Sequence, residues 1–423
     1  MHDTGTLIRG RSGWLVATTL LLTLLLGFGA KGQEEGSPEA EAAQQGRPFV
    51  PAEAQREDHD TWTMPLGDYA GTRYSELDSI DRDNVHELEL VWQFETGYTP
   101  GHEAPPLIID DTMYVAMPFP NALYAFDLTS TPPTVKWVYE PEPEPAAQGV
   151  ACCDAVNRGA IYADGKVIFV TLDGQVVAVD VESGEAAWTT QLGDIQIGET
   201  MTMAPLVVRD RVLVGNSGGE FGVRGWIAAL DLDSGEEVWR GWSTGPDEEV
   251  LIGEEFAPHY EQYRGEDLGI ASWPGDMWRI GGGTVWGWIT YDPELDLIFY
   301  GTGNPSPWNP QVRPGDNQWT AGIFARDPDT GEARWFYQFS PHDQYDYDAV
   351  NESLVIDMEF EGELRQLLVR PERNGYVYLL DRTDGQVLAA DPFVHITTSR
   401  GVDLETGRLI DVPENEPDFD RTA

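Results

Sequence analysis

Positively charged side chains are scarce in this sequence. Its 423 residues hold 26 Lys and Arg against 73 Asp and Glu, which gives a formal net charge of −47 at pH 7. A surface with this balance repels nucleic acid and anionic lipid, so neither is expected as a partner. The excess of carboxylates is typical of a solubility adaptation to high salt, in which salt screens their mutual repulsion. A dedicated basic partner is the alternative explanation.

The sequence also lacks a long hydrophobic run. Its most apolar stretch, Trp14 to Phe28, is short for a membrane span and follows Arg9 and Arg11. This pattern predicts a signal peptide over residues 1–32 and export to the periplasm, with no stable membrane insertion after cleavage. An uncleaved anchor is the alternative. Residues 33–56 are rich in Glu, Ala, Gln and Pro without periodicity, which predicts a flexible acidic linker before a domain over residues 57–423.

Cysteine is nearly absent. The only two cysteines, Cys152 and Cys153, are adjacent. Export implies an oxidising compartment, in which two free neighbouring thiols would be a liability. A disulfide between neighbours would close a tight ring and strain the intervening peptide.

What the sequence does contain is a repeat, Ala-x-Asp-x-x-Ser/Thr-Gly-x-x-x-Trp, in three clear and two weaker copies. Its aspartates are Asp127, Asp180, Asp231, Asp327 and Asp381. They lie 51–54 residues apart except for one gap of 96 residues. Because this gap is close to two periods, we expect residues 284–304 to form a skipped unit.

A period near 50 residues predicts a propeller or a solenoid. Short β-rich runs, such as residues 166–171 and 176–179, alternate with Asp-Gly or Ser-Gly turns. No long helical run alternates with them, which excludes a parallel α/β fold. We therefore expect each unit to form one four-stranded blade, locked to its neighbour by the Trp of the repeat. The repeats alone fit a non-enzymatic binding propeller as well as an enzyme.

Several segments interrupt the repeat and carry Gly, Cys and polar residues. They are residues 71–75, 152–159, 218–225, 281–288, 301–309, 313–319, 341–348 and 373–375. In this order they resemble the PQQ-dependent (quinoprotein) alcohol dehydrogenases, closest to the lanthanide-dependent methanol dehydrogenases, from about Trp62 to Asp411. The resemblance implies an all-β, eight-bladed propeller with PQQ on its axis. About the first six blades would be present, because family members continue beyond the position of Ala423.

The resemblance also implies the cofactor contacts. A disulfide between Cys152 and Cys153 would form a rigid plate over one face of PQQ, and Trp286 would stack on the other. Arg158 can meet a PQQ carboxylate with a bidentate fork. The other matching positions are Glu103, Thr202, Ser217, Gly218, Gly219, Thr284 and Arg373.

A cation on PQQ is implied as well, with Glu220, Asn304 and Asp346 as its oxygen ligands. Asp346 would also be the general base, and Arg373 would stabilise charge on the reactive carbonyl oxygen. The lanthanide-dependent branch carries an extra acid two residues after this Asp, which is Asp348 here. Residues at i and i+2 of an extended segment point the same way, so both acids could face one ion. A lanthanide(III) is therefore favoured, with Ca²⁺ as the alternative.

The function implied is periplasmic oxidation of a small primary alcohol, methanol, with electrons passed to a soluble cytochrome c. A homodimer is compatible with this assignment. Tyr345 replaces a Trp that the family usually has before the catalytic Asp, and His342 is expected to be structural. An inactive chain is the remaining alternative.

Overall fold

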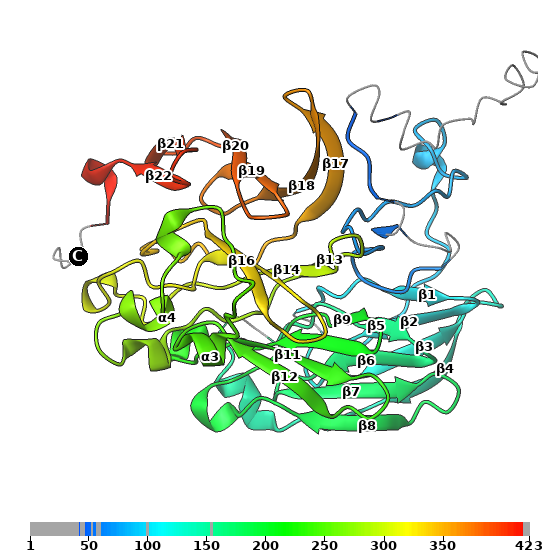
Figure 1. The fold of residues 1–423 in the computed structure, drawn as a ribbon. Helices are drawn as coiled ribbons and strands as arrows, with labels where there is room; N and C mark the ends of the chain where they lie inside the picture. The colour runs from blue at the N-terminus through cyan, green and yellow to red at the C-terminus, as the bar shows by residue number, and fades with distance from the viewer. Residues whose placement is uncertain are drawn as a thin grey trace, which may run out of the picture.

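The computed structural model describes residues 42, 47–51, 54–55, 61–98, 101–152 and 155–417. Within these residues the chain forms five four-stranded sheets and one two-stranded sheet. Every pair of neighbouring strands is antiparallel, and each sheet uses strands that are consecutive in the sequence (Figure 1). The predicted signal peptide and Cys153 lie outside the described residues.

The strands of the first three sheets are short and follow one another closely. The first sheet comprises β1 (Leu107–Ile109), β2 (Thr112–Ala116), β3 (Leu123–Asp127) and β4 (Thr134–Tyr139). The second comprises β5 (Ile161–Ala163), β6 (Lys166–Val170), β7 (Gln175–Asp180) and β8 (Ala186–Gln191). The third comprises β9 (Leu206–Val208), β10 (Arg211–Gly215), β11 (Trp226–Asp231) and β12 (Glu237–Trp242).

The later sheets follow a longer connection. The fourth comprises β13 (Ile289–Asp292), β14 (Leu297–Gly301), β15 (Gly322–Arg326) and β16 (Ala333–Gln338). The fifth comprises β17 (Leu354–Phe360), β18 (Glu363–Pro371), β19 (Tyr376–Asp381) and β20 (Val387–Pro392), and the sixth pairs β21 (Ser399–Asp403) with β22 (Arg408–Asp411). Helices are short: α3 (Asp247–Val250) and α4 (Leu268–Ala271), with 3-10 turns at η2 (Val85–Glu87), η3 (Pro145–Gly149), η4 (Ile195–Ile197), η5 (Gly219–Phe221), η6 (Glu261–Tyr263), η7 (Met277–Ile280), η8 (Pro310–Val312) and η9 (Pro413–Asn415).

The sheets are arranged as the blades of a propeller. The first strands of successive sheets, β5, β9, β13 and β17, contact one another in that order. The first strand of the third sheet is wholly buried, whereas its fourth strand alternates between buried and exposed positions. Antiparallel sheets with one edge inward and one edge outward explain why these short strands are apolar near the axis and polar outside. The predicted propeller is confirmed, while the total of eight blades stays a prediction.

In four of the five repeats a tryptophan docks on the next blade, as the repeat predicts. The ring of Trp188 lies against Gly235, where a Cβ atom would sit 2.5 Å from the indole. Its Nε1 donates to the Leu232 carbonyl at 3.0 Å, one residue after the repeat aspartate. The same pattern joins Trp137 to Val181, Trp239 to Pro328 and Trp335 to Arg382. Only glycine leaves room for the indole at this turn.

The expectation of a skipped unit is wrong. Trp239 in β12 docks on Gly331 in the turn between β15 and β16, so the third and fourth sheets are direct neighbours. Residues 284–304 instead contain β13 and β14. Most of the extra length lies in residues 243–288, which hold α3 and α4, and the rest lies in residues 302–321, which hold η8. An insertion about as long as one repeat cannot be distinguished from a repeat by spacing alone.

This insertion also replaces a missing tryptophan. In β20, Ala389 stands opposite Leu379, at the position that Trp335 occupies opposite Ala325 in β16. Tyr260 fills the vacant place, because its ring lies 2.6 Å from where a Cβ on Gly407 would be. The Tyr260 hydroxyl accepts from the Val387 N–H at 3.0 Å and donates to the Leu404 carbonyl at 3.3 Å. Leu404 follows Asp403, so the bond reproduces the tryptophan pattern and fastens the sixth sheet.

Part of the predicted linker is docked on the fifth sheet. The Phe49 N–H donates to the Asp357 carbonyl at 2.8 Å, and the Asp357 N–H donates back to Phe49 at 2.7 Å. Pro51 and Ala54 are buried. None of the helices in the described ranges of the chain has the length and apolarity needed to cross a membrane.

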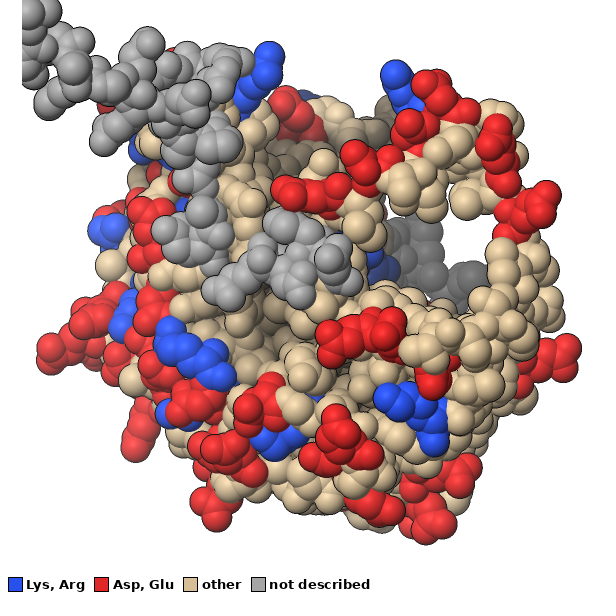
Figure 2. All heavy atoms as spheres, turned by 90° about the vertical axis from the view of Figure 1, so that its right-hand side faces the viewer, with Lys and Arg blue, Asp and Glu red and all other residues tan. Residues whose placement is uncertain are grey.

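Acidic side chains dominate the surface, as the composition predicts. Figure 2 shows them spread over the face viewed there, with fewer and scattered Lys and Arg side chains. Many arginines are shared between acids: Arg209 lies 2.8 Å from both Asp296 and Asp329. Such exposed pairs contribute little stability individually, and the 73 acids far exceed the 26 cations.

Candidate active site

A cavity of about 200 Å³ lies where loops of several blades converge. Most residues that the sequence assigned to the site line it: Cys152, Arg158, Thr202, Ser217, Gly218, Glu220, Trp286, Asp346, Asp348 and Arg373. Cys152 is disulfide-bonded, and its predicted partner Cys153 lies outside the described residues. Segments as far apart in the sequence as Cys152 and Arg373 therefore meet at one point.

A chain of polar contacts links four predicted cofactor residues. The Arg158 Nη1 donates to Thr202 Oγ1 at 2.8 Å, and the hydroxyl groups of Thr202 and Ser217 are 2.9 Å apart. Glu103 Oε2 lies 3.3 Å from Arg158 Nε, outside the cavity wall itself. Burial lowers the pKa of Arg158, against the opposing influence of Glu103 and Asp348. The guanidinium is thus held at the cavity wall as a fixed anion-binding group.

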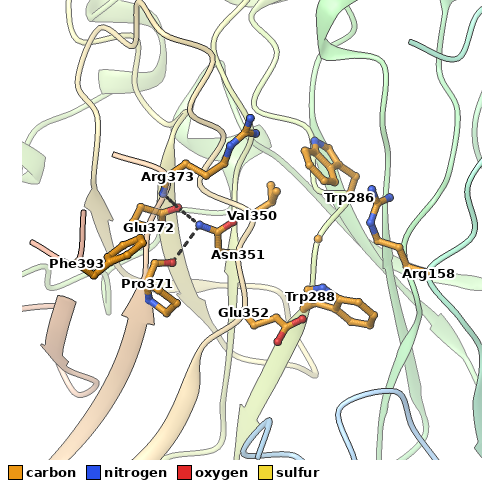
Figure 3. Close-up of a pocket in the computed structure, with 11 residues that line it drawn as sticks. Arg158, Trp286, Trp288, Val350, Asn351, Glu352, Pro371, Glu372, Arg373 and Phe393 are labelled. Atoms are coloured by element: carbon orange, nitrogen blue, oxygen red, sulfur yellow. Dashed lines mark hydrogen bonds between the residues drawn. The ribbon is translucent and has the colours of Figure 1, made fainter. Parts of the chain in front are cut away.

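Arg158 stacks over the Trp286 ring in the wall of the cavity. The guanidinium carbon of Arg158 lies 4.7 Å from the centroid of the Trp286 ring. A second cavity, of about 390 Å³, shares Arg158, Trp286 and Arg373 as walls, and Figure 3 shows Trp286 between the two arginines. The two cavities together offer the space that a flat, multiply charged ligand needs beside the indole face.

Close backbone packing brings the Glu220 loop to the centre. Gly218 has φ 109°, and a Cβ there would lie 2.2 Å from the Gly198 carbonyl oxygen. Gly219 packs on Thr284, whose Oγ1 would lie 3.2 Å from an added Cβ. Neither Gly219 nor Thr284 lines the cavity; together they support it. The Gly-rich segments are therefore needed for close approach of two blades.

Three carboxyl groups face this site. Burial raises the pKa of Glu220 and of Asp346, and it raises the pKa of Asp348 to about 8. Asp346 also raises the pKa of Glu220, and both of these acids raise the pKa of Asp348. Asp346 Oδ1 is buried and has no hydrogen-bond partner. An orphaned carboxylate oxygen among repelling acids is the donor set that a hard cation would satisfy.

The carboxyl groups of Glu220, Asp346 and Asp348 do not form a closed ligand shell. Across the described stretches of the chain, no group of three His, Cys, Asp or Glu side chains is arranged closely enough to hold a metal ion. Asp348 accounts for part of this: its Oδ1 accepts from the Asn304 N–H at 2.6 Å, and its Oδ2 faces Arg373. Asn304 lies outside the first cavity but lines a third, of about 430 Å³, together with Asp346.

Asp346 and Asp348 were expected to point the same way because their segment would be extended, and that expectation of an extended segment is wrong. The segment is not extended, because Asp346 has φ 60° and Asp348 has φ 42°. Both residues face the cavity since the loop turns around Asp343, whose carboxylate accepts from the N–H groups of Tyr345 and Tyr347 at 2.9 and 2.8 Å. Two left-handed residues separated by one position are costly and mark a functional loop.

Some lining residues were not assigned from the sequence. Val156 and Trp308 line the first cavity, and Asn351, Glu372 and Phe393 line the second. Val156 and Trp308 belong to segments that interrupt the repeat, so that signal could have found them. Asn351 and Glu372 lie outside both the repeat copies and these segments, so no sequence signal marked them. His342 contacts the Gly315 carbonyl at 2.9 Å, which agrees with a structural role.

The fold and site define a β-propeller with a charge-lined cavity where loops of several blades converge. The chain belongs to the family of PQQ-dependent dehydrogenases: the family model described as "Glucose/ethanol/alcohol dehydrogenase, beta-propeller domain" matches residues 62–390.

Named relatives agree. The chain is 49% identical over 354 residues to a lanthanide-dependent methanol dehydrogenase of Methylacidiphilum fumariolicum (strain SolV), covering 84% of this chain and 58% of that protein. It is 47% identical to subunit 1 of a cytochrome c methanol dehydrogenase of Paracoccus denitrificans, covering 86% and 58%. The solved structure of a europium-containing methanol dehydrogenase superposes with a TM-score of 0.83 at 49% identity, over 85% of this chain and 62% of that one. The chain thus spans under two thirds of these relatives' length.

Proposed function

We propose that this chain oxidises a small primary alcohol, methanol, to the aldehyde, with PQQ and a bound cation as cofactors. The observation that carries the proposal is the convergence of Glu220, Asp346 and Asp348 with Arg373 in one cavity beside Trp286. Support comes from the family membership and from relatives named as methanol dehydrogenases. The proposal concerns the whole protein, because this chain spans under two thirds of the length of these relatives.

The residues present fit both cofactors. Trp286 offers a flat apolar face, and Arg158 offers a fork of donors for a carboxylate. Cys152, in a disulfide with Cys153, would close the opposite face. Glu220, Asn304, Asp346 and Asp348 would hold the cation through oxygen atoms. Three carboxylates favour a trivalent ion, so we infer a lanthanide, with Ca²⁺ as the alternative.

When bound, metal-activated PQQ supplies an acceptor for the two electrons that leave the alcohol as hydride. Asp346 takes the hydroxyl proton of the alcohol as general base, a role that suits a carboxyl whose pKa burial has raised. Arg373 donates hydrogen bonds where negative charge develops. Trp308 and Tyr345, at the cavity that also holds Asp346, limit the size of the alcohol.

The compartment and the acceptor are proposed with the activity. A signal peptide over residues 1–32 would deliver the protein to the periplasm. A soluble cytochrome c would accept the electrons, because one relative is named as a cytochrome c methanol dehydrogenase. The acidic surface would attract a basic electron carrier.

A dye-linked assay tests the activity. The whole protein is loaded with PQQ and either La³⁺ or Ca²⁺, and dye reduction is followed with methanol, ethanol and larger primary alcohols. The proposal expects methanol-dependent reduction with La³⁺ and its loss in Asp346→Asn. The absence of alcohol-dependent reduction with either cation would contradict it and would favour a non-enzymatic propeller.

A further inference from the structure

A fully buried ion pair lies directly beneath the proposed site. Arg370 Nε and Glu372 Oε2 are 2.8 Å apart, and each side chain is 1% exposed. Burying two charges costs desolvation that their attraction only partly offsets, so such a pair is a weak source of stability. Neither residue lines the cavity that holds the three acids, and of the two only Glu372 lines the second cavity. Their remaining hydrogen bonds show what they hold in place.

Arg370 binds the loop that carries the acids. Its Nη2 donates to the carbonyl of Ala349, the residue directly after Asp348, and its Nη1 donates to Ser353 Oγ at 3.0 Å. The Ala349 N–H is bound from the other side by the Thr302 carbonyl at 3.1 Å. Gly301 presses on the same peptide, since a Cβ there would lie 1.5 Å from the Ala349 oxygen. Ala349, which follows Asp348, is thereby held through both its N–H and its carbonyl group.

Glu372 binds the turn that carries Arg373. Its Oε1 accepts from the Arg373 N–H at 3.3 Å and from Asn351 Nδ2 at 2.6 Å. Asn351 also donates to the Pro371 carbonyl at 3.0 Å, and Figure 3 shows it bridging Pro371 and Glu372 below Arg373. The ion pair therefore joins the loop of Asp346 and Asp348 to the turn of Arg373 through charge-assisted hydrogen bonds.

We propose that Arg370 and Glu372, with Asn351, are positioning residues that set the separation between Asp348 and Arg373. This inference rests on the proposed function, because that function assigns Asp348 to the cation and Arg373 to the reactive oxygen. Groups that orient the residues around a metal affect affinity and rate without touching the reactants.

The chain offers a matched control. Arg382 is equally buried, with its side chain 0% exposed, and pairs with Asp292 and Asp357. These contacts join β13 to β17 and contact no residue of the site loops. Glu372→Gln leaves the buried Arg370 without a carboxylate, whereas Asp292→Asn leaves Arg382 with Asp357 alone, and both changes lower stability. Only the Arg370–Glu372 pair is expected to change the site.

The experiment compares Glu372→Gln, Asn351→Ala and Asp292→Asn in the full chain. Tb³⁺ binding is measured by luminescence sensitised by nearby tryptophan, thermal unfolding gives Tm, and the loaded enzyme gives kcat and KM for methanol. We expect Glu372→Gln and Asn351→Ala to weaken Tb³⁺ binding and lower kcat by about 10- to 100-fold, with KM nearly unchanged. Asp292→Asn should lower Tm yet keep the Tb³⁺ Kd and kcat within about twofold of the original chain.

The outcomes separate the two proposals. If Glu372→Gln does not fold, Asn351→Ala decides, because it leaves the ion pair intact. Original Tb³⁺ affinity in folded Asn351→Ala would overturn the positioning role, as would an equal loss of affinity in Asp292→Asn. If the unmodified chain binds Tb³⁺ but oxidises no alcohol, the proposed function fails while the Tb³⁺ comparison still decides the positioning role.

Discussion

Arg373 Nη1 lies 3.2 Å from Asp348 Oδ2, in the cavity lined by Asp346 and Glu220. Asp348 is the most buried of the three acids and the one whose pKa is raised furthest, to about 8. The contact pairs Arg373, the proposed stabiliser of the reactive oxygen, with Asp348, the acid proposed to favour a trivalent cation. Arg373 thus supplies a counter-charge to Asp348, which a cation among the three acids would share.

Removing the charge of Asp348 should select against trivalent ions. In Asp348→Asn, Tb³⁺ affinity should fall at least about tenfold, and Ca²⁺ affinity should fall less, because ligand charge sets the affinity of oxygen sites. Tb³⁺ luminescence titration of the full chain measures the first affinity, and displacement of bound Tb³⁺ by Ca²⁺ measures the second. The control is Glu236→Gln, which removes an acid from an exposed turn. Equal loss of Tb³⁺ affinity in both variants would attribute the effect to net charge alone.

Cation binding should strengthen as the pH rises. Asp348 has a pKa near 8 and is mostly protonated at pH 6, so a cation must displace its proton. Apparent La³⁺ affinity should therefore rise by up to about tenfold per pH unit from pH 6 to 8 and then level off. Calorimetry in buffers of different ionisation enthalpy measures the protons released. Affinity that is constant over this range, or a dependence unchanged in Asp348→Asn, would contradict the assignment.

Tyr260 should behave as the docking residue of the sixth sheet. Tyr260→Ala should cost about 3–5 kcal/mol of unfolding free energy, as expected for losing a large buried ring. Tyr260→Phe keeps the ring and removes the bonds to Val387 and Leu404, so its cost should be about 1 kcal/mol. Urea denaturation measures both, and limited proteolysis between β20 and β22 reports local release. A Tyr260→Ala variant of normal stability would show that the insertion does not fasten this sheet.

Stability should depend on salt. With a formal charge of −47, carboxylate repulsion favours the unfolded chain at low ionic strength. The screening length falls from about 10 Å at 0.1 M to about 3 Å at 1 M salt, so Tm should climb steadily over this range. Thermal unfolding in KCl measures the slope. A Tm that falls or stays constant with added KCl would argue for a basic partner instead of adaptation to salt.

The sequence was informative where one physical constraint acts on one position. The Trp and Gly of each repeat predict blade docking because an indole fits only above a glycine turn, and the Gly-rich segments predict close approach. The spacing of the repeats gave a wrong prediction around residues 243–288, because an insertion of about one period resembles a repeat. No local signal marks Tyr260 as a replacement for tryptophan. Nor could pattern reveal the left-handed loop of Asp346 and Asp348, which depends on the distant turn at Asp343.

The most direct test is to locate the cation. Crystals of the whole protein grown with PQQ and La³⁺ give an anomalous signal for the lanthanide at its own position. We expect one strong peak bounded by oxygen atoms of Glu220, Asn304, Asp346 and Asp348, with planar density for PQQ against Trp286. A lanthanide peak elsewhere, or planar density away from Trp286, would contradict the central claim that these residues form the cofactor site.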